Sequence, residues 1–121
     1  MISRLICVIL AAMLLGGCAT SSFKSAYDKP DGKTMVVSKS VWDGYQKYLN
    51  QIGATYHGAF VVQVYGGRAD GYADSYCPGS SCFAGPAFVN QAMKSCRESG
   101  GDCVLFALNN DITVNYRIEG Q

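Results

Sequence analysis

The sequence has no excess of charge of either sign and no apolar run long enough to cross a membrane. Its 121 residues contain ten Lys and Arg against nine Asp and Glu, scattered along the chain. Binding to nucleic acid needs clustered positive charge for the phosphates, so no nucleic-acid partner is expected. The apolar stretch Leu5 to Leu15 is shorter than the roughly 20 residues of a spanning helix.

Residue types that carry catalysis are also scarce. His57 is the single histidine, and no G-x-S-x-G elbow accompanies it, so a solvated loop histidine is favoured over the base of a nucleophile. There is no C-x-x-C redox pair. The four later cysteines are spaced C-x₄-C and C-x₆-C, which touches or exceeds the two to four intervening residues that zinc sites prefer, so disulfides are favoured over a structural zinc ion. We therefore expect no catalytic residue, no metal and no cofactor.

The first residues have the organisation of an export signal. Arg4 precedes the apolar run, and the small residues Gly16 and Gly17 lead into Cys18. A charged start, an apolar segment of roughly 7–15 residues and small residues at the cleavage site are typical of a secretory signal peptide. The stretch Leu15 to Cys18 also resembles the lipobox of bacterial lipoproteins. The alternative is an ordinary cleaved signal with a cysteine near the cut.

This resemblance implies that residues 1–17 are removed and that Cys18 carries lipid at the new N-terminus. A bacterial lipoprotein bears two or three acyl chains, palmitate among them, and more than one chain is needed for stable attachment to a membrane. The implied location is the cell envelope, with the domain outside the cytoplasm. Because Ala19 and not Asp follows the cysteine, the outer membrane is implied if the host is a diderm.

The remaining chain divides into a tether and one domain. Residues 18–33 are polar and contain Pro30 and Gly32, which is typical of a flexible tether. Residues 34–121 are enough for one domain and too few for two. Loss of Arg4 with the signal would leave nine basic against nine acidic residues, so the lipid would be the whole membrane attachment.

Four cysteines remain for the folded domain: Cys77, Cys82, Cys96 and Cys103. An even number in a short exported chain favours two disulfides, for which three pairings exist. We prefer Cys77–Cys82 with Cys96–Cys103, because each pair joins near neighbours in sequence.

The hydrophobic pattern predicts an α+β fold. Helices are expected over residues 40–52 and 87–99, the first with a capping box from Ser40 to Asp43 and a C-terminal Gly53. Strands are expected over residues 34–37, 59–65, 72–76, 103–108 and 112–118. Together these predict a small antiparallel sheet, built of two hairpins, with both helices on one face and disulfides as staples.

The segment from Pro86 to Leu108 resembles small secreted bacterial domains of unknown function, which have a helix with a late cysteine, a second cysteine and an apolar strand. The resemblance covers about a quarter of the mature chain. It implies an extracytoplasmic α/β module stapled through Cys96 and Cys103, with no assigned chemistry. The further pair Cys77 and Cys82 departs from this pattern.

Three functional hypotheses follow. The first is a non-enzymatic envelope domain that binds a protein or a cell-wall glycan such as peptidoglycan through exposed aromatics, for which Tyr65, Tyr72 and Tyr76 are the candidates. The second is an envelope hydrolase or inhibitor-type protein that uses loop carboxylates, with Asp70 and Asp74 as the acids. The third is a structural lipoprotein without a defined site.

Overall fold

The computed structural model describes residues 24–53, 57–77 and 86–121. The predicted signal peptide, Cys18 and Cys82 lie outside the described residues. No helix in these three ranges is long and apolar enough to cross a membrane. In chain order the elements are β1 (Thr34–Val37), α2 (Lys39–Ile52), β2 (Gly58–Tyr65), β3 (Arg68–Tyr76), α3 (Pro86–Glu98), β4 (Asp102–Leu108), β5 (Asp111–Ile112) and β6 (Asn115–Ile118).

Helix α2 confirms the predicted helix, but it begins earlier than the capping box suggested. Ser38 is the N-cap, and its side-chain oxygen accepts a hydrogen bond from the backbone N–H of Val41. An N-cap oxygen satisfies one of the free N–H groups of the first turn. The expected box from Ser40 to Asp43 is therefore wrong. The predicted end is confirmed, since the N–H of Gly53 donates to the carbonyl of Leu49.

Strands β2 and β3 form the first predicted hairpin. Gly66 and Gly67 make its two-residue turn with φ angles of 56° and 80°. Positive φ at both central positions matches the twist of the flanking strands, and glycine adopts it without steric cost. The strands pair antiparallel from Gly58 opposite Tyr76 to Tyr65 opposite Arg68, with one register shift between Gln63 and Val64.

The sheet is mixed, so the prediction of two antiparallel hairpins is wrong. The strand order is β5-β4-β2-β3-β1-β6, and β1 runs parallel to both β3 and β6. The strand expected over residues 112–118 is divided: β5 pairs antiparallel with β4, and β6 crosses to β1 at the opposite end of the sheet. Because only two residues separate β5 from β6, the sheet has to curl.

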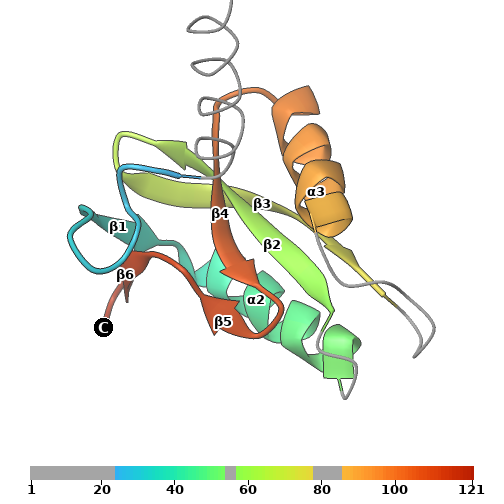
Figure 1. Cartoon of the computed structure of the whole chain (residues 1–121). Helices are drawn as coiled ribbons and strands as arrows, with labels where there is room; N and C mark the ends of the chain where they lie inside the picture. The colour runs from blue at the N-terminus through green and yellow to red at the C-terminus, as the bar shows by residue number, and fades with distance from the viewer. Residues whose placement is uncertain (1–23, 54–56, 78–85) are drawn as a thin grey trace, which may run out of the picture.

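The two helices cover opposite faces of the sheet, which corrects the expectation of one shared face (Figure 1). Side chains alternate along a strand, and β2 shows the consequence. Phe60 and Val62 pack in the core cluster that contains α2, and Val61 packs in the cluster that contains α3. Both faces of β2 are therefore buried.

The chain before β1 belongs to the domain. The N–H of Lys29 donates to the carbonyl of Thr113, the N–H of Asn115 donates to the carbonyl of Tyr27, and Tyr27 packs against the α2 core cluster. Asp28 also forms a β-bridge with Val114. The flexible tether expected over residues 18–33 therefore does not include residues 27–29.

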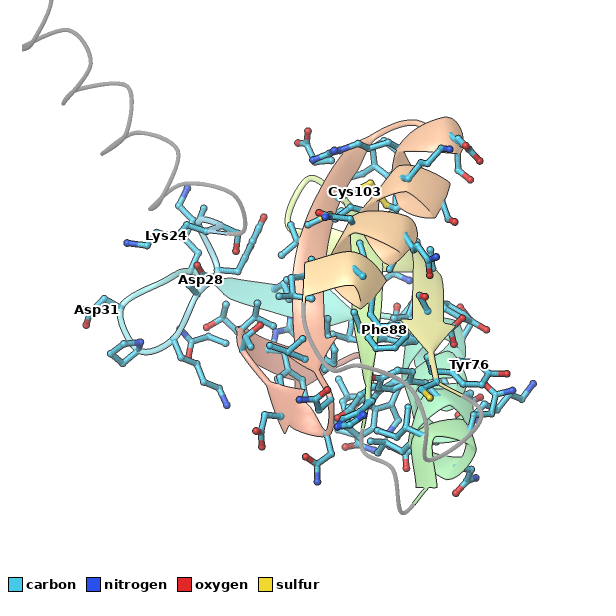
Figure 2. The ribbon with its side chains drawn as sticks, turned by 45° about the vertical axis from the view of Figure 1, so that its right-hand side comes forward. Lys24, Asp28, Asp31, Tyr76, Phe88 and Cys103 are labelled. Atoms are coloured by element: carbon cyan, nitrogen blue, oxygen red, sulfur yellow. A yellow bond between two sulfur atoms is a disulfide. The ribbon has the colours of Figure 1, made fainter. Side chains whose placement is uncertain are left out.

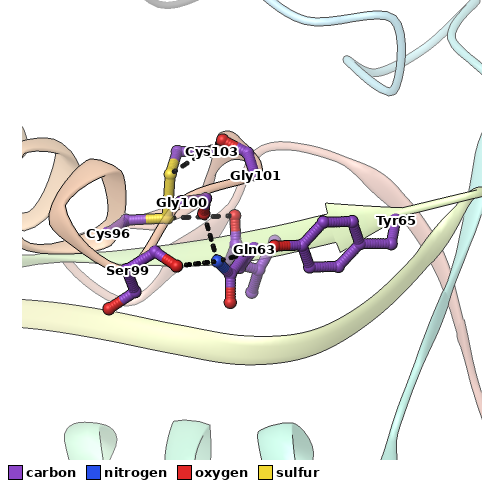
Figure 3. Close-up of a disulfide and its surroundings, with 8 residues drawn as sticks. Gln63, Tyr65, Cys96, Ser99, Gly100, Gly101 and Cys103 are labelled. Atoms are coloured by element: carbon purple, nitrogen blue, oxygen red, sulfur yellow. Dashed lines mark hydrogen bonds between the residues drawn. A yellow bond between two sulfur atoms is a disulfide. The ribbon is translucent and has the colours of Figure 1, made fainter.

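The predicted disulfide between Cys96 and Cys103 is confirmed, with Cα atoms 6.0 Å apart. Beside it, the side-chain N–H of Gln63 donates to the carbonyls of Ser99 and Gly100, so β2 satisfies carbonyls at the end of α3 (Figure 3). Cys77 is also disulfide-bonded. Its pairing with Cys82 stays a prediction, because Cys82 lies outside the described residues.

Candidate binding surface on strand β3

The three candidate tyrosines lie on two different faces. Tyr72 lies against Gly44 of α2, and Tyr76 packs against the same core cluster as α2. Tyr65 lies against Gly101 in the turn after α3. Residues 72 and 76 therefore share one face, as their sequence parity indicates, and Tyr65 is separate from them.

Tyr72 is an exposed ring held in a fixed position. Its ring stacks on Phe60 with centroids 5.0 Å apart and an interplanar angle of 19°. Its edge meets Gly44, where an added Cβ would lie 2.4 Å from the ring. Tyr72 is nevertheless 45% exposed, and Phe60 is fully buried. Rigid aromatic side chains with one free face are effective binding groups, because little rotamer entropy is lost when a partner covers them.

Gly44 is the residue that the sequence interpretation overlooked. Glycine inside a helix destabilises it by roughly 0.5–1 kcal/mol relative to alanine, and such a glycine often marks a close approach. Gly44 lies in the middle of α2 and is buried. The close approach is that of the Tyr72 ring. The residue that least favours the helix therefore lies where α2 contacts the candidate binding tyrosine.

Asp74 lies two residues after Tyr72 on the same face of β3. It is opposite Phe60 in the register of the hairpin, and it is half-buried. Burial raises the pKa of its carboxyl group, and a hydrogen bond from its own backbone N–H opposes this shift. Both ion pairs among the described residues involve Arg68, so no lysine or arginine in those ranges neutralises Asp74.

Asp70, the other candidate acid, is already paired. Arg68 donates from Nε to its carboxylate at 2.9 Å, and from Nη1 and Nη2 to both carboxylate oxygens of Glu119. Along a strand, Asp70 and Asp74 are separated by about 13 Å at 3.3 Å per residue. Carboxylate pairs of glycoside hydrolases lie about 5–9.5 Å apart. The strand thus gives these two acids separate environments.

The tyrosines beneath the surface belong to the core. Tyr45 and Tyr48 of α2 are buried, and both rings contact Phe60. Burial raises the pKa of each phenol, and the negative charge of Asp74 adds to the shift at Tyr48. The Tyr48 hydroxyl donates to the carbonyl of Asn109 at 2.7 Å. These hydroxyls therefore remain protonated at neutral pH.

The structure also places the histidine and the metal-binding residue types. His57 directly precedes β2, is half-buried, and its carbonyl accepts a hydrogen bond from the N–H of Cys77. Within the described ranges, no three His, Cys, Asp or Glu residues are grouped so that they could hold a metal ion. The surface around Tyr72 is therefore the described feature best suited to binding.

No protein-family model, curated protein or solved structure matches this chain.

Proposed function

We infer that this protein is a lipid-anchored lipoprotein of the bacterial cell envelope whose domain binds an envelope partner through the face that carries Tyr72. The anchor is the lipid on Cys18, and the lipobox-like stretch Leu15 to Cys18 supports it. The export route agrees with the disulfide chemistry, because disulfides persist in oxidising compartments outside the cytoplasm.

The observation that supports the binding function is that Tyr72 is exposed and yet held in place by Phe60 and Gly44. An aromatic ring that is 45% exposed would ordinarily be free to move. Here Phe60 supports one face of the ring, and a helix glycine gives its edge room. Gly44 disfavours the helix and Tyr72 exposes an apolar ring, and both features occur at the same place. Such a combination is typical of a binding surface.

Two experiments test the two parts of this proposal. Cys18→Ser in the native host is expected to move the protein from the membrane fraction to the soluble envelope fraction. A photo-reactive phenylalanine analogue at position 72 is expected to form adducts of higher mass with an envelope component. The same analogue at Lys94, an exposed position on α3, is the matched control and should form none.

Gly44→Ala separates binding from folding. The new methyl group would displace the Tyr72 ring, while alanine improves the helix by roughly 0.5–1 kcal/mol. We expect unchanged or slightly altered stability with at least tenfold weaker capture of the cross-linked component. Equal adducts at positions 72 and 94, or undiminished capture by Gly44→Ala, would contradict the binding role.

A further inference from the structure

Most of strand β3 has a neighbour on only one side. It pairs with β2 from Arg68 to Tyr76, with Asp70 left out at the register shift, but it pairs with β1 only at Arg68 and Ala69. After Ala69 the chain of β1 turns away into α2. No other described strand pairs with residues 70–76. This stretch is therefore an open edge, although β3 is not the last strand in the order of the sheet. Such edges present free N–H and C=O groups that an extended chain can bond.

The hydrogen-bond alternation identifies the groups that face this edge. The N–H of Cys77 donates to the carbonyl of His57, which directs residue 77 toward β2. Alternate residues of an antiparallel strand bond to opposite sides. Residues 71, 73 and 75 therefore also face β2, and the N–H and C=O groups of Tyr72, Asp74 and Tyr76 face the free edge.

The exposure of the strands agrees with this assignment. Residues 58–62 of β2 are all buried, whereas residues 70–76 of β3 are all half-buried or exposed. Figure 2 shows this part of β3, with Tyr76 labelled, at the border of the molecule between the two helices. Contacts join α3 and α2 to β3, and the two core clusters place these helices on its two faces and not along its outer edge.

The side chains beside this edge favour a positively charged group. Tyr72 offers an exposed ring face, and Asp74 offers a carboxylate two residues away on the same face. A ring face and a carboxylate together attract an ammonium or guanidinium group.

The same carboxylate disfavours a second copy of the chain. Antiparallel pairing of residues 72–76 with the same edge of a copy would bring Asp74 opposite Asp74 in the symmetric register, and diagonal to it when the register shifts by two residues. Like charges in such cross-strand positions are destabilising, and charge on an edge strand is a common protection against self-pairing. A strand with a basic residue at that position meets no such repulsion.

We propose that the edge of β3 from Tyr72 to Tyr76 binds an extended peptide segment of a protein partner by strand addition, with a Lys or Arg side chain received by Tyr72 and Asp74. This proposal rests on the binding function argued above and narrows its partner from envelope components in general to a protein with an exposed basic strand.

The test uses the full-length chain in detergent micelles and a fluorescent peptide, Thr-Val-Thr-Lys-Thr-Val-Thr. The peptide is expected to bind at least tenfold more tightly than its version with Glu in place of Lys. Asp74→Lys should reverse that preference, while Asp70→Asn, on the same strand but paired with Arg68, should leave it unchanged. N-methylation of alternate peptide amides should abolish binding.

Amide exchange supplies the second measurement. In the free protein the amides of Tyr72, Asp74 and Tyr76 should exchange faster than those of Ala73 and Ser75, and the Lys peptide should slow them. Slow exchange of all five amides in the free monomer, absence of binding at millimolar peptide, or no preference for Lys over Glu would overturn strand addition.

Other occupants give their own results. A dimer that protects the same three amides would assign the edge to a second copy, and soluble peptidoglycan fragments that shift Tyr72 without slowing those amides would assign the surface to glycan. Each result overturns this proposal. If adducts at position 72 persist in either case, the binding function itself stands, so the two proposals fail separately.

Discussion

Tyr48 links helix α2 to the turn after β4 through one hydroxyl group. That hydroxyl donates to the carbonyl of Asn109 at 2.7 Å, and the Tyr48 side chain is fully buried. We expect Tyr48→Phe to lower the free energy of unfolding by about 1 kcal/mol, because the acceptor loses its donor. Tyr45→Phe is the matched control, since its hydroxyl makes no hydrogen bond within the described residues and is not a buried unpaired group, so removing it leaves no acceptor without a donor. Urea unfolding checks both, and equal losses would contradict the assignment.

Asn109 is the one described residue other than glycine with a positive φ, at 54°. Its side-chain oxygen also accepts a hydrogen bond from the N–H of Gly58. Both Asn109→Ala and Asn109→Gly remove that acceptor, but only alanine is strained in the left-handed region. We therefore expect alanine to be less stable than glycine by about 1–2 kcal/mol in urea unfolding. The same stability for both variants would argue against a left-handed Asn109.

Asp74 gives the protein a pH-dependent element of stability. Its pKa is raised in the folded state by burial, so folding favours the protonated carboxyl. Its charged form therefore destabilises the fold as pH rises from the ordinary Asp range through the raised pKa. We expect Asp74→Asn to be more stable than the parent chain at pH 7 and equal to it near pH 3.

Urea unfolding at the two pH values measures this difference, with Asp70→Asn as control. Asp70 accepts a hydrogen bond from Arg68, so removal of its charge should not stabilise the chain at pH 7. A stabilisation by Asp74→Asn that persists at pH 3 would show that burial of the charge is not its cause.

At the scale of elements, local patterns in the sequence predict well what lies along the chain. The stripe from Val41 to Ile52, the glycine turn after Tyr65 and the apolar run from Cys103 each became the expected element. The packing of one element against another is harder to predict from local sequence patterns. The continuous apolar run of β2 did signal that both faces are covered, and this signal argues against both helices on one face.

The division of the last strand has no local signal. Residues 112–118 alternate apolar and polar, which fits one strand as well as two. Their pairing with β1 joins residues about 80 positions apart, and no short pattern encodes such a contact. For the same reason, only part of the candidate surface could be predicted from the sequence. Tyr72 stands out as an aromatic on a strand, but its contact with Gly44 depends on packing between elements.

The disulfide between Cys96 and Cys103 fixes the end of α3 to the start of β4. The cysteines are seven residues apart, and closing so short a loop is worth about 2–3 kcal/mol. We expect the double variant Cys96→Ala, Cys103→Ala to lose that much stability and to melt roughly 10–20 °C lower. Ser95→Ala, an exposed neighbour on the same helix, is the control. Thermal unfolding that is unchanged would mean that Gln63 holds this end of the helix alone.

At the scale of the molecule, the curled sheet depends on contacts between the two ends of the described chain. Strand β6 pairs parallel with β1. Tyr116 of β6 stacks on Trp42 of α2 with centroids 5.6 Å apart and meets Phe106 of β4 at 5.4 Å. One aromatic side chain thus connects β6 with the helix and with the opposite side of the sheet, so loss of β6 should affect the whole fold.

We therefore expect a chain that ends at Val114 to unfold without cooperativity, because β1 loses a partner strand and Trp42 loses its stacked ring. Trp42 is the single tryptophan, so its fluorescence reports on this contact directly. A chain that ends at Glu119 retains β6 and should melt like the parent. A cooperative transition at an unchanged temperature in the shorter chain would show that β1, α2 and the central strands fold without β6. The pairing of β6 with β1 would then add nothing to the cooperative folding of the remaining strands and helices.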